Sequence, residues 1–181
     1  MTNRLILITG MAGSGKTTLS TIIRASGIRV ITMGDVIRDY ARQLGLDPNQ
    51  ETIGHLAEDI RKEGPDAVAR RCLKILKTTP QDLVVVDGIR SLAEVDAFKG
   101  EYEATLVAIH ASPLSRFKRL TRRGRSDDPR TWEEFKERDR RELGFGIGDA
   151  IASADYMIIN DDGIESLGPA FESVVRRVQD G

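Results

Sequence analysis

One stretch constrains the fold of this chain more than any other: Gly10-Met11-Ala12-Gly13-Ser14-Gly15-Lys16-Thr17. It matches the phosphate-binding pattern G-x-x-x-x-G-K-[ST] at every defined position. An apolar, strand-forming run precedes it at Arg4 to Thr9, and a helix-compatible segment follows it from Lys16 to Ala25. Glycines let backbone N–H groups converge on an anion, and a helix that begins there presents its positive end to the same anion. The stretch therefore predicts a phosphate-binding loop between a strand and a helix.

This loop assigns roles to its own residues and to a carboxylate further along the chain. Lys16 is expected to reach the β- and γ-phosphates of a nucleotide, and the Thr17 hydroxyl is expected to hold Mg²⁺. Asp87 ends the apolar run 83–86, where phosphate-loop enzymes place the carboxylate that orders Mg²⁺. The sequence has no N-K-x-D guanine signature, so ATP is the expected nucleotide. The predicted nucleotide-binding residues of the loop are Gly10, Met11, Ala12, Gly13, Ser14, Gly15, Lys16, Thr17 and Thr18.

The order of the predicted elements indicates the fold class. Strands are expected near Leu5–Thr9, Arg29–Thr32, Leu83–Asp87, Thr105–His110 and Tyr156–Ile159. Helix-compatible segments separate them, and this alternation predicts an α/β fold with a parallel sheet that helices cover on both faces. With 181 residues and no linker or repeat, the chain is expected to form one domain over residues 1–181.

Two intervals are longer than a minimal crossover helix needs, and both are candidate moving parts over a nucleotide site. The first, 33–80, is expected to contain a loop around residues 45–48 and a helix that Gly64 ends. A second helix is expected to follow with Pro65 at its first position. We take this interval as the predicted acceptor-binding segment.

The second interval, 112–148, is the predicted lid region. A helix is expected to start at Ser112-Pro113 and to end at Gly124. Thr131 and Glu134 then form a capping-box pattern for another helix. The residues expected to face inward from the first of these helices are Leu114, Phe117 and Leu120.

Basic residues gather in the lid region, where residues 116–141 hold eleven of the 27 Lys and Arg. Most are expected to form a solvated helical face with i,i+4 pairs. Arg123, Arg125 and Arg138 are the predicted catalytic members. Arg123 and Arg125 flank a glycine next to Asp127-Asp128. Planar guanidinium groups suit the spread charge of a transferring phosphoryl group.

Two isolated arginines follow other predicted strands. Arg38 lies beside Asp35 and Arg90 lies beside Asp87. All four are near the carboxyl ends of strands, where ligands bind in open α/β sheets. Surface salt bridging is the alternative role for these arginines. If both pointed into the cleft, they would form a second anion site opposite the loop.

Bulk properties exclude several other classes of protein. The net charge of −1 provides no field that would draw the chain to nucleic acid or to a membrane. The single Cys72 excludes an intramolecular disulfide framework. The N-terminal apolar run Leu5 to Ile8 is too short for a signal peptide or a membrane span, so a cytoplasmic location is expected.

With these motifs in place, the chain resembles the nucleoside monophosphate kinase group, which includes adenylate kinase and UMP/CMP kinase. Gly10 to Thr17 is similar to their phosphate loop, and Met33 to Arg38 is similar to their acceptor-binding segment. Asp87 to Arg90 resembles their strand-three motif, and Arg123 to Asp128 resembles their lid. The resemblance implies a P-loop kinase fold with a five-stranded parallel sheet, a helical acceptor segment and a short helical lid that carries arginines.

The C-terminal part Ala154 to Asn160 is instead similar to dephospho-CoA kinases, where the last strand leads into a loop beside the ATP base. This implies that Asn160 flanks the donor base. Those kinases also carry an Asp where Asp35 stands, poised over the acceptor hydroxyl. The combination most resembles an archaeal family described as adenylate-kinase-related or dephospho-CoA-kinase-like. Four segments carry that match, 64–66, 87–94, 125–128 and 144–148.

The resemblance implies Mg²⁺-ATP-dependent phosphoryl transfer to a small nucleotide-like acceptor, whose phosphate Arg38 and Arg90 would bind. Two departures matter. Ile89 stands where adenylate kinases have Pro, and Glu94 aligns near the Gln that reads the acceptor adenine. Glu94 is therefore a candidate acceptor-binding residue that argues against AMP. Two alternatives stay open, transfer to a hydroxyl and a slow ATPase or nucleotide-dependent switch that binds a protein or RNA partner. Gly88 follows Asp87 where ATP-driven motors place a Glu.

Overall fold

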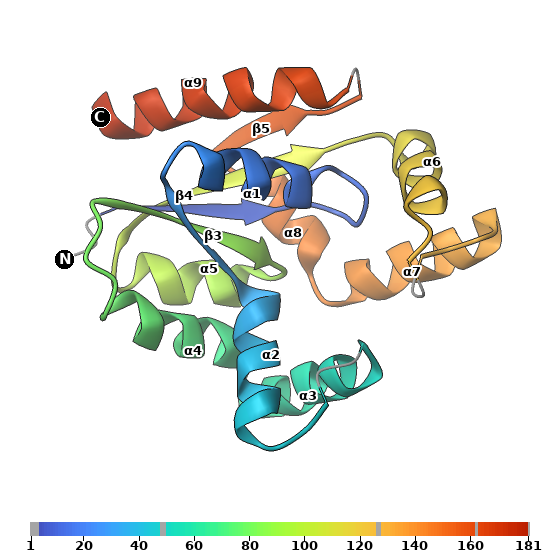
Figure 1. The fold of residues 1–181 in the computed structure, drawn as a ribbon, viewed down its shortest axis with the longest axis horizontal. Helices are drawn as coiled ribbons and strands as arrows, with labels where there is room; N and C mark the ends of the chain where they lie inside the picture. Colours follow the sequence, from blue (N-terminus) through green and yellow to red (C-terminus); the bar gives the residue numbers. More distant parts are fainter. Residues whose placement is uncertain (1–3, 48–49, 126–127, 162, 181) are drawn as a thin grey trace.

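The computed structural model describes residues 4–47, 50–125, 128–161 and 163–180 of the 181 (Figure 1). They contain a five-stranded sheet in the order β2-β3-β1-β4-β5, and every neighbouring pair is parallel. The strands are β1 (Arg4–Thr9), β2 (Arg29–Thr32), β3 (Leu83–Ile89), β4 (Glu103–His110) and β5 (Tyr156–Ile159). All five predicted strands are confirmed, and β3 continues two residues past Asp87.

Helices cover both faces of the sheet, as predicted (Figure 1). On one face α1 (Lys16–Ala25) and α9 (Leu167–Asp180) pack on Ile6 and Ile8 of β1. On the other face α2 (Met33–Gln43), α4 (Ala67–Leu76) and α5 (Leu92–Lys99) pack on Leu5 and Leu7. Successive strand side chains point to opposite faces. A strand that is buried on both faces therefore needs the unbroken apolar run that β1 has.

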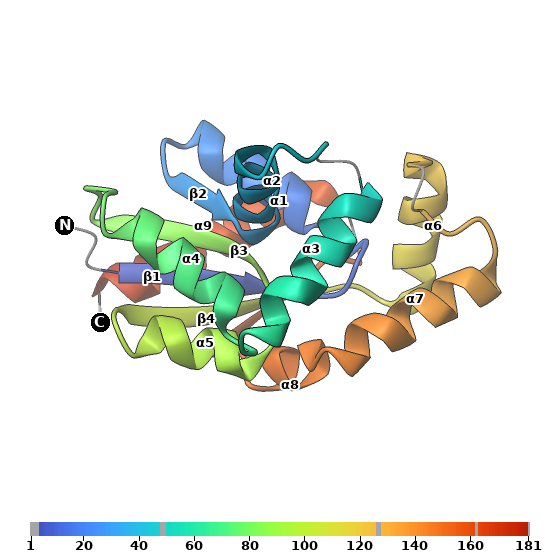
Figure 2. The same ribbon diagram turned by 90° about the horizontal axis from the view of Figure 1, so that it is seen from below.

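The remaining helices extend beyond the carboxyl ends of the strands. They are α3 (Gln50–Lys62), α6 (Pro113–Arg123), α7 (Trp132–Gly144) and α8 (Ile147–Ala152), and a 3₁₀ turn at Ile164–Ser166 precedes α9. Figure 2 shows α3 on one side of this edge and α6 and α7 on the other. Strand β1 lies between β3 and β4, so the chain order reverses around it. Ligands of open α/β sheets bind at such a reversal.

Sequence patterns predicted some helix boundaries correctly and others incorrectly. Ser112 caps α6 with Pro113 in its first turn, and Thr131 and Glu134 form the predicted capping box of α7. Pro65 is not the first residue of a helix, because residues 65–66 form a turn and α4 begins at Ala67. The prediction that Leu114 faces inward is also wrong, since it is 56% exposed.

Helix α2 follows β2 directly, without a loop between them. Its first residue is Met33, and Thr32 holds the N-cap position. Asp35 therefore lies inside the first turn of α2 and does not cap it. A carboxylate in a first turn still favours the positive end of the helix.

Candidate functional site

The phosphate loop connects β1 to α1, and its glycines adopt backbone angles that other residues avoid. Gly10 has a φ of 144° and Gly15 a φ of 112°. A Cβ on Gly10 would lie 2.3 Å from the carbonyl oxygen of Ile109, and one on Gly15 would lie 2.3 Å from Nδ2 of Asn160. Both positions therefore require glycine for its freedom at positive φ and for close packing.

Three side chains from outside the loop hold its carbonyl groups. Arg116 Nη1 donates to the Ala12 carbonyl at 3.2 Å, and Asn160 Nδ2 donates to the Ser14 carbonyl at 2.7 Å. Arg119 makes a longer contact of 3.5 Å to the carbonyl of Gly13. A trans peptide points its N–H away from its C=O. Holding the carbonyls on one side therefore directs amides to the other, which suits an anion site.

Lys16 is folded back over the loop. Its Nζ donates to the carbonyl oxygens of Gly10 at 2.5 Å and of Met11 at 3.1 Å. Burial lowers the pKa of the Lys16 ammonium below its usual value, while Asp87 opposes that shift. An incoming phosphate oxygen would offer this partly dehydrated ammonium a stronger, charge-assisted partner than a carbonyl.

Asp87 lies in β3 behind the loop. Its Oδ2 accepts a hydrogen bond of 2.7 Å from the hydroxyl of Ser20, whereas its Oδ1 is buried without a hydrogen-bond partner. Buried polar atoms are almost always satisfied, so an orphaned carboxylate oxygen suggests a missing ligand. The described residues contain no cluster of three or more His, Cys, Asp or Glu that could bind a metal by themselves. Any cation here would keep waters or phosphate oxygens as further ligands, which is the habit of Mg²⁺.

A cavity of about 360 Å³ opens in front of the loop, and cationic side chains surround it. Seven of the described residues that line it are basic: Lys16, Arg38, Arg90, Arg119, Arg123, Arg125 and Arg138. Glu142 is the single acid among the described lining residues. The phosphate loop and the start of α1 form the side of the cavity where a phosphate donor would bind, and they contribute Gly10, Ala12, Gly13, Gly15 and Thr17. This excess of basic over acidic lining residues favours an anionic ligand.

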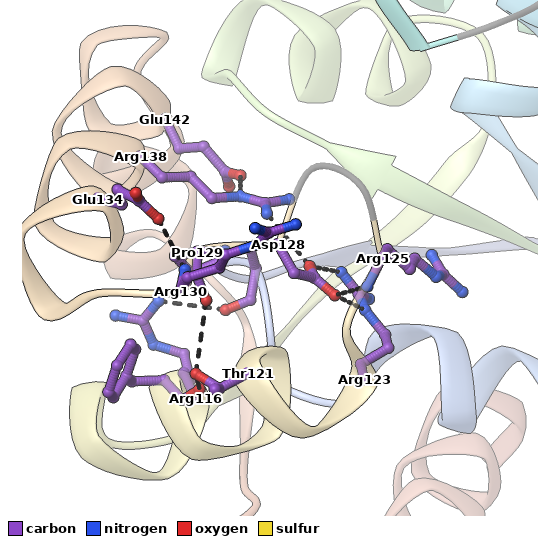
Figure 3. A network of polar contacts seen from close by, with 12 residues as sticks. Arg116, Thr121, Arg123, Arg125, Asp128, Pro129, Arg130, Glu134, Arg138 and Glu142 are labelled. Atoms are coloured by element: carbon purple, nitrogen blue, oxygen red, sulfur yellow. Dashed lines mark hydrogen bonds and ion pairs between the residues drawn. The ribbon is translucent and has the colours of Figure 1, made fainter.

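Two lid arginines, Arg123 and Arg138, point their side chains at Asp128, whereas the side chain of Arg125 extends away from it (Figure 3). Arg123 donates to both carboxylate oxygens, at 2.8 Å from Nε and 2.5 Å from Nη2. The Arg125 backbone N–H donates at 3.0 Å, and Arg138 Nη1 lies 3.4 Å from the same carboxylate. The hydrogen bond from Arg123 holds the pKa of Asp128 below its usual range. The lid motif also includes Ser126 and Asp127, which lie outside the described residues.

The predicted acceptor-binding residues differ in whether they line the cavity. Arg38 and Arg90 both line the cavity, as the second-anion-site hypothesis requires. Asp35 does not line it, and its exposed carboxylate pairs with Arg38 at 2.5 Å. Arg38 therefore connects an exposed acid to the cavity.

Glu94 lies behind Arg90 and not on the cavity wall. Its side chain is fully buried, Oε2 accepts from the Arg90 backbone N–H at 2.7 Å, and Oε1 lies 3.6 Å from Arg61 of α3. Burial raises the pKa of this carboxyl. Its contacts position Arg90, so a part in acceptor binding would be indirect.

Some predicted nucleotide contacts lie away from the cavity wall. Met11, Ser14, Thr18 and Asn160 are not among the residues that line the cavity. Asn160 is 1% exposed and braces the loop from behind. Its backbone carbonyl accepts a hydrogen bond of 2.6 Å from Arg119.

Sequence reasoning gave no place in the site to Gly88, Arg119 and Glu142, although all three line the cavity. Gly88 has a φ of 108° beside an irregularity in the β1–β3 register. Its place after a strand-end Asp could have marked it as a bulge. Arg119 and Glu142 carry no such signal, because they are two of many charges on amphipathic helices.

Comparisons with known proteins agree with this geometry. Residues 6–142 match the sequence model of a family described as "AAA domain". A UPF0200 protein of Hyperthermus butylicus is 46% identical over 175 residues, covering 96% of this chain and 92% of the relative. A UPF0200 protein of Pyrococcus furiosus is 45% identical and covers 98% of both chains.

Two solved structures share the fold at low sequence identity. The crystal structure of TT1252 from Thermus thermophilus aligns with a TM-score of 0.65 at 20% identity, covering 98% of each chain. Shikimate kinase from Bacteroides thetaiotaomicron aligns with a TM-score of 0.64 at 17% identity, covering 95% of this chain and 98% of the kinase. In the described part of the chain, no helix has the length and apolar character needed to span a bilayer.

Proposed function

This chain belongs to the family described as "AAA domain" and to the UPF0200 family, and from that premise we propose that it is an Mg²⁺-ATP-dependent phosphotransferase. Its acceptor would be a small, nucleotide-like molecule with a phosphate of its own, as in nucleoside monophosphate kinases. The fold is that of a P-loop kinase-like protein, which hosts several such reactions. The choice among them has to come from the site.

One observation carries the proposal: the cavity has cations on both the donor side and the acceptor side. Lys16 and the loop amides offer a place for the β- and γ-phosphates of ATP. Arg38 and Arg90, on the predicted acceptor side, line the same cavity, and so do the lid arginines Arg123, Arg125 and Arg138. A hydrolase needs only the donor half, whereas transfer between two phosphates needs both.

The residues present also fit Mg²⁺. The free Oδ1 of Asp87 and the hydroxyl of Thr17 are hard oxygen donors at the loop, and they would hold the ion together with phosphate oxygens and waters. When bound, Mg²⁺ neutralises charge on the β- and γ-oxygens. Arg123, Arg125 and Arg138 would stabilise the charge that spreads over the transferring group.

The position of Asp35 favours a phosphate acceptor over a hydroxyl. A hydroxyl must lose its proton during transfer and needs a positioned base, whereas a phosphate monoester is already ionised. Asp35 lies off the cavity wall and is paired with Arg38, which itself reaches the cavity. This arrangement orients a phosphate-binding arginine more readily than it activates a hydroxyl.

The test is ADP release from ATP against nucleoside monophosphates, nucleoside diphosphates and dephospho-CoA. We expect a nucleoside monophosphate to stimulate release, and Arg38→Ala to raise the KM for that acceptor about tenfold. Arg42→Ala is the matched control. Arg42 makes the same i,i+3 pair of 2.5 Å on α2, with Asp39, but does not line the cavity.

Two outcomes would replace the proposal with an alternative. Stimulation by dephospho-CoA alone, with a thousandfold loss in Asp35→Asn, would indicate transfer to a hydroxyl. ATP turnover that no acceptor changes would indicate a slow ATPase or switch.

A further inference from the structure

A buried arginine on α6 connects the phosphate loop to the lid although it does not line the cavity. The side chain of Arg116 is only 5% exposed. Its Nε donates to the carbonyl of Ala111 after β4 at 3.2 Å, and its Nη1 donates to the carbonyl of Ala12 at 3.2 Å. The same guanidinium forms a two-pronged ion pair with Asp139 of α7, through Nη1 to Oδ1 at 2.8 Å and through Nη2 to Oδ2. One side chain thus joins the chain directly after β4, the phosphate loop and the lid helix α7.

A cluster of three aromatic rings packs against this ion pair through Phe135. The guanidinium carbon of Arg116 lies 4.9 Å from the ring centre of Phe135, which is 1% exposed. Phe135 stacks on Trp132, with ring centres 5.0 Å apart and planes at 26°. Phe117 of α6 meets both rings. Polar contacts are stronger and more directional in such a dry environment. Losing one partner leaves a costly buried charge.

Asp139 is the neighbour of Arg138, which lines the cavity and reaches Asp128. Both residues belong to the same helix, so the ion pair that fixes Asp139 also fixes the backbone that carries Arg138. At the other end, the peptide of Ala12 carries the N–H of Gly13, which points away from the held carbonyl. An anion on that amide would polarise the peptide and strengthen its hydrogen bond to Arg116.

We propose that Arg116 and Asp139 are positioning residues that couple phosphate binding on the loop to the placement of α7 and therefore of Arg138. This inference rests on the proposed function and deepens it. The chain of contacts runs from the Gly13 amide through the Ala12 carbonyl, Arg116 and Asp139 to the lid helix. Neither positioning residue touches the reacting groups.

The sole tryptophan reports on this coupling without any need for turnover. Trp132 is at the start of α7 and stacks on the ring that packs against Arg116. We expect ATP to change Trp132 fluorescence in the wild-type protein. Asp139→Asn and Arg116→Lys should lose that change while calorimetry gives an ATP Kd within about threefold of wild type. Asp139→Asn is the milder variant because it keeps an acceptor oxygen and most of the shape.

The matched control is Glu133→Gln, the same acid-to-amide change in an exposed α7 pair, Glu133 with Lys136 at 3.6 Å. It should keep both ATP binding and the fluorescence response. Thermal unfolding of every variant shows that the folded protein is being compared.

Kinetics separate positioning from general stability. Asp139→Asn should lower kcat about tenfold or more through misplacement of Arg138. In an Arg138→Ala background the same change should cost less than about threefold more, since both act on one group. Independent, multiplied losses would overturn the inference, as would an unchanged ATP response in Asp139→Asn or no response of wild-type Trp132 to bound ATP. Failure of the wild type to bind ATP at all would instead overturn the proposed function, and this inference with it.

Discussion

The phosphate loop and the arginine lid face the same cavity, but the chain holds them in opposite ways. The loop is fixed through its main chain, by Arg116 at Ala12 and by Asn160 at Ser14. Because side chains from outside the loop take these two carbonyls, the amides of the same two peptides, those of Gly13 and Gly15, point to the other side. This half of the site is organised before anything binds, which is how a site avoids reorganisation during a reaction.

The lid is fixed through its side chains, and the protein supplies the counter-charge. Asp128 accepts from Arg123 in a two-pronged pair and also contacts Arg138. Both arginines line the cavity, so the carboxylate occupies donors that a phosphoryl group would also use. Under the proposed function, the loop half would provide affinity for the nucleotide, whereas the lid half would exchange the Asp128 carboxylate for the transferring phosphoryl group.

The largest expected effect is on stability and comes from the phosphate loop, because there is no space for a side chain at Gly10. Gly10→Ala places a Cβ 2.3 Å from the Ile109 carbonyl at a φ of 144°. We expect it to lower the free energy of unfolding by about 3 kcal/mol or more. Gly27→Ala is the control, since Gly27 also has a positive φ, of 84°, but has open space around it. Its cost should be about 1 kcal/mol. Urea unfolding measures both, and equal losses would show that the loop is not tightly packed.

The second effect concerns Lys16, the loop side chain that is expected to approach the phosphates. Lys16→Ala should reduce phosphoryl transfer by about 10²-fold or more, because a fixed charge is removed from the transition state. The fold should survive, since this side chain contacts only two loop carbonyls. The assay is ADP release at saturating ATP, with the exposed Lys77→Ala as control. Full turnover by Lys16→Ala would contradict the assignment of the loop.

On the lid side, kcat should change more than affinity. Arg123→Lys keeps the charge but loses the planar fork, so we expect kcat to fall about tenfold and the ATP Kd to stay within about threefold. Arg122→Lys is the neighbouring control, because Arg122 does not line the cavity. If Arg123→Lys instead weakened ATP binding and left kcat unchanged, the lid would contribute to ATP affinity as the loop does, and the two regions would not differ in role.

The same contrast separates what the sequence predicted from what it could not. The loop, the strand β1 and the α7 capping box are local patterns, so their residues were readable from spacing alone. The burial of Arg116 was not readable, because its partners Ala12 and Asp139 are distant in sequence. Leu114 was expected to face inward from α6, but it is exposed and Arg116 is buried instead. Hydropathy ranks Leu as the more buried residue type because it carries no information on hydrogen-bond partners.

Residue roles show the same limit. Arg38 and Arg90 were found near strand ends, and the cavity includes both. Glu94 and Asp35 are close to them in sequence but lie off the cavity wall, because one is turned inward under Arg90 and the other outward beside Arg38. Sequence spacing places a residue on an element but does not decide which of its neighbours it will contact.

The smallest expected effect tests whether Asp128 holds the lid electrostatically. The hydrogen bond from Arg123 depresses the pKa of Asp128 in the folded protein. The unfolded state therefore takes up this proton first as the pH falls, and the stabilisation is lost as pH drops from about 3.9, the unfolded value, through the folded pKa. Asp128→Asn should lower the free energy of unfolding by about 1 kcal/mol at pH 7. That difference should be unchanged at pH 5 and shrink below pH 4, as urea unfolding at each pH would show.

The control is Asp59→Asn, which breaks the exposed pair of 2.6 Å with Lys62 and should have no measurable effect at pH 7. A difference that stays the same below pH 4 would mean that Asp128 acts through its shape and not its charge, and the lid would then be as rigid as the loop.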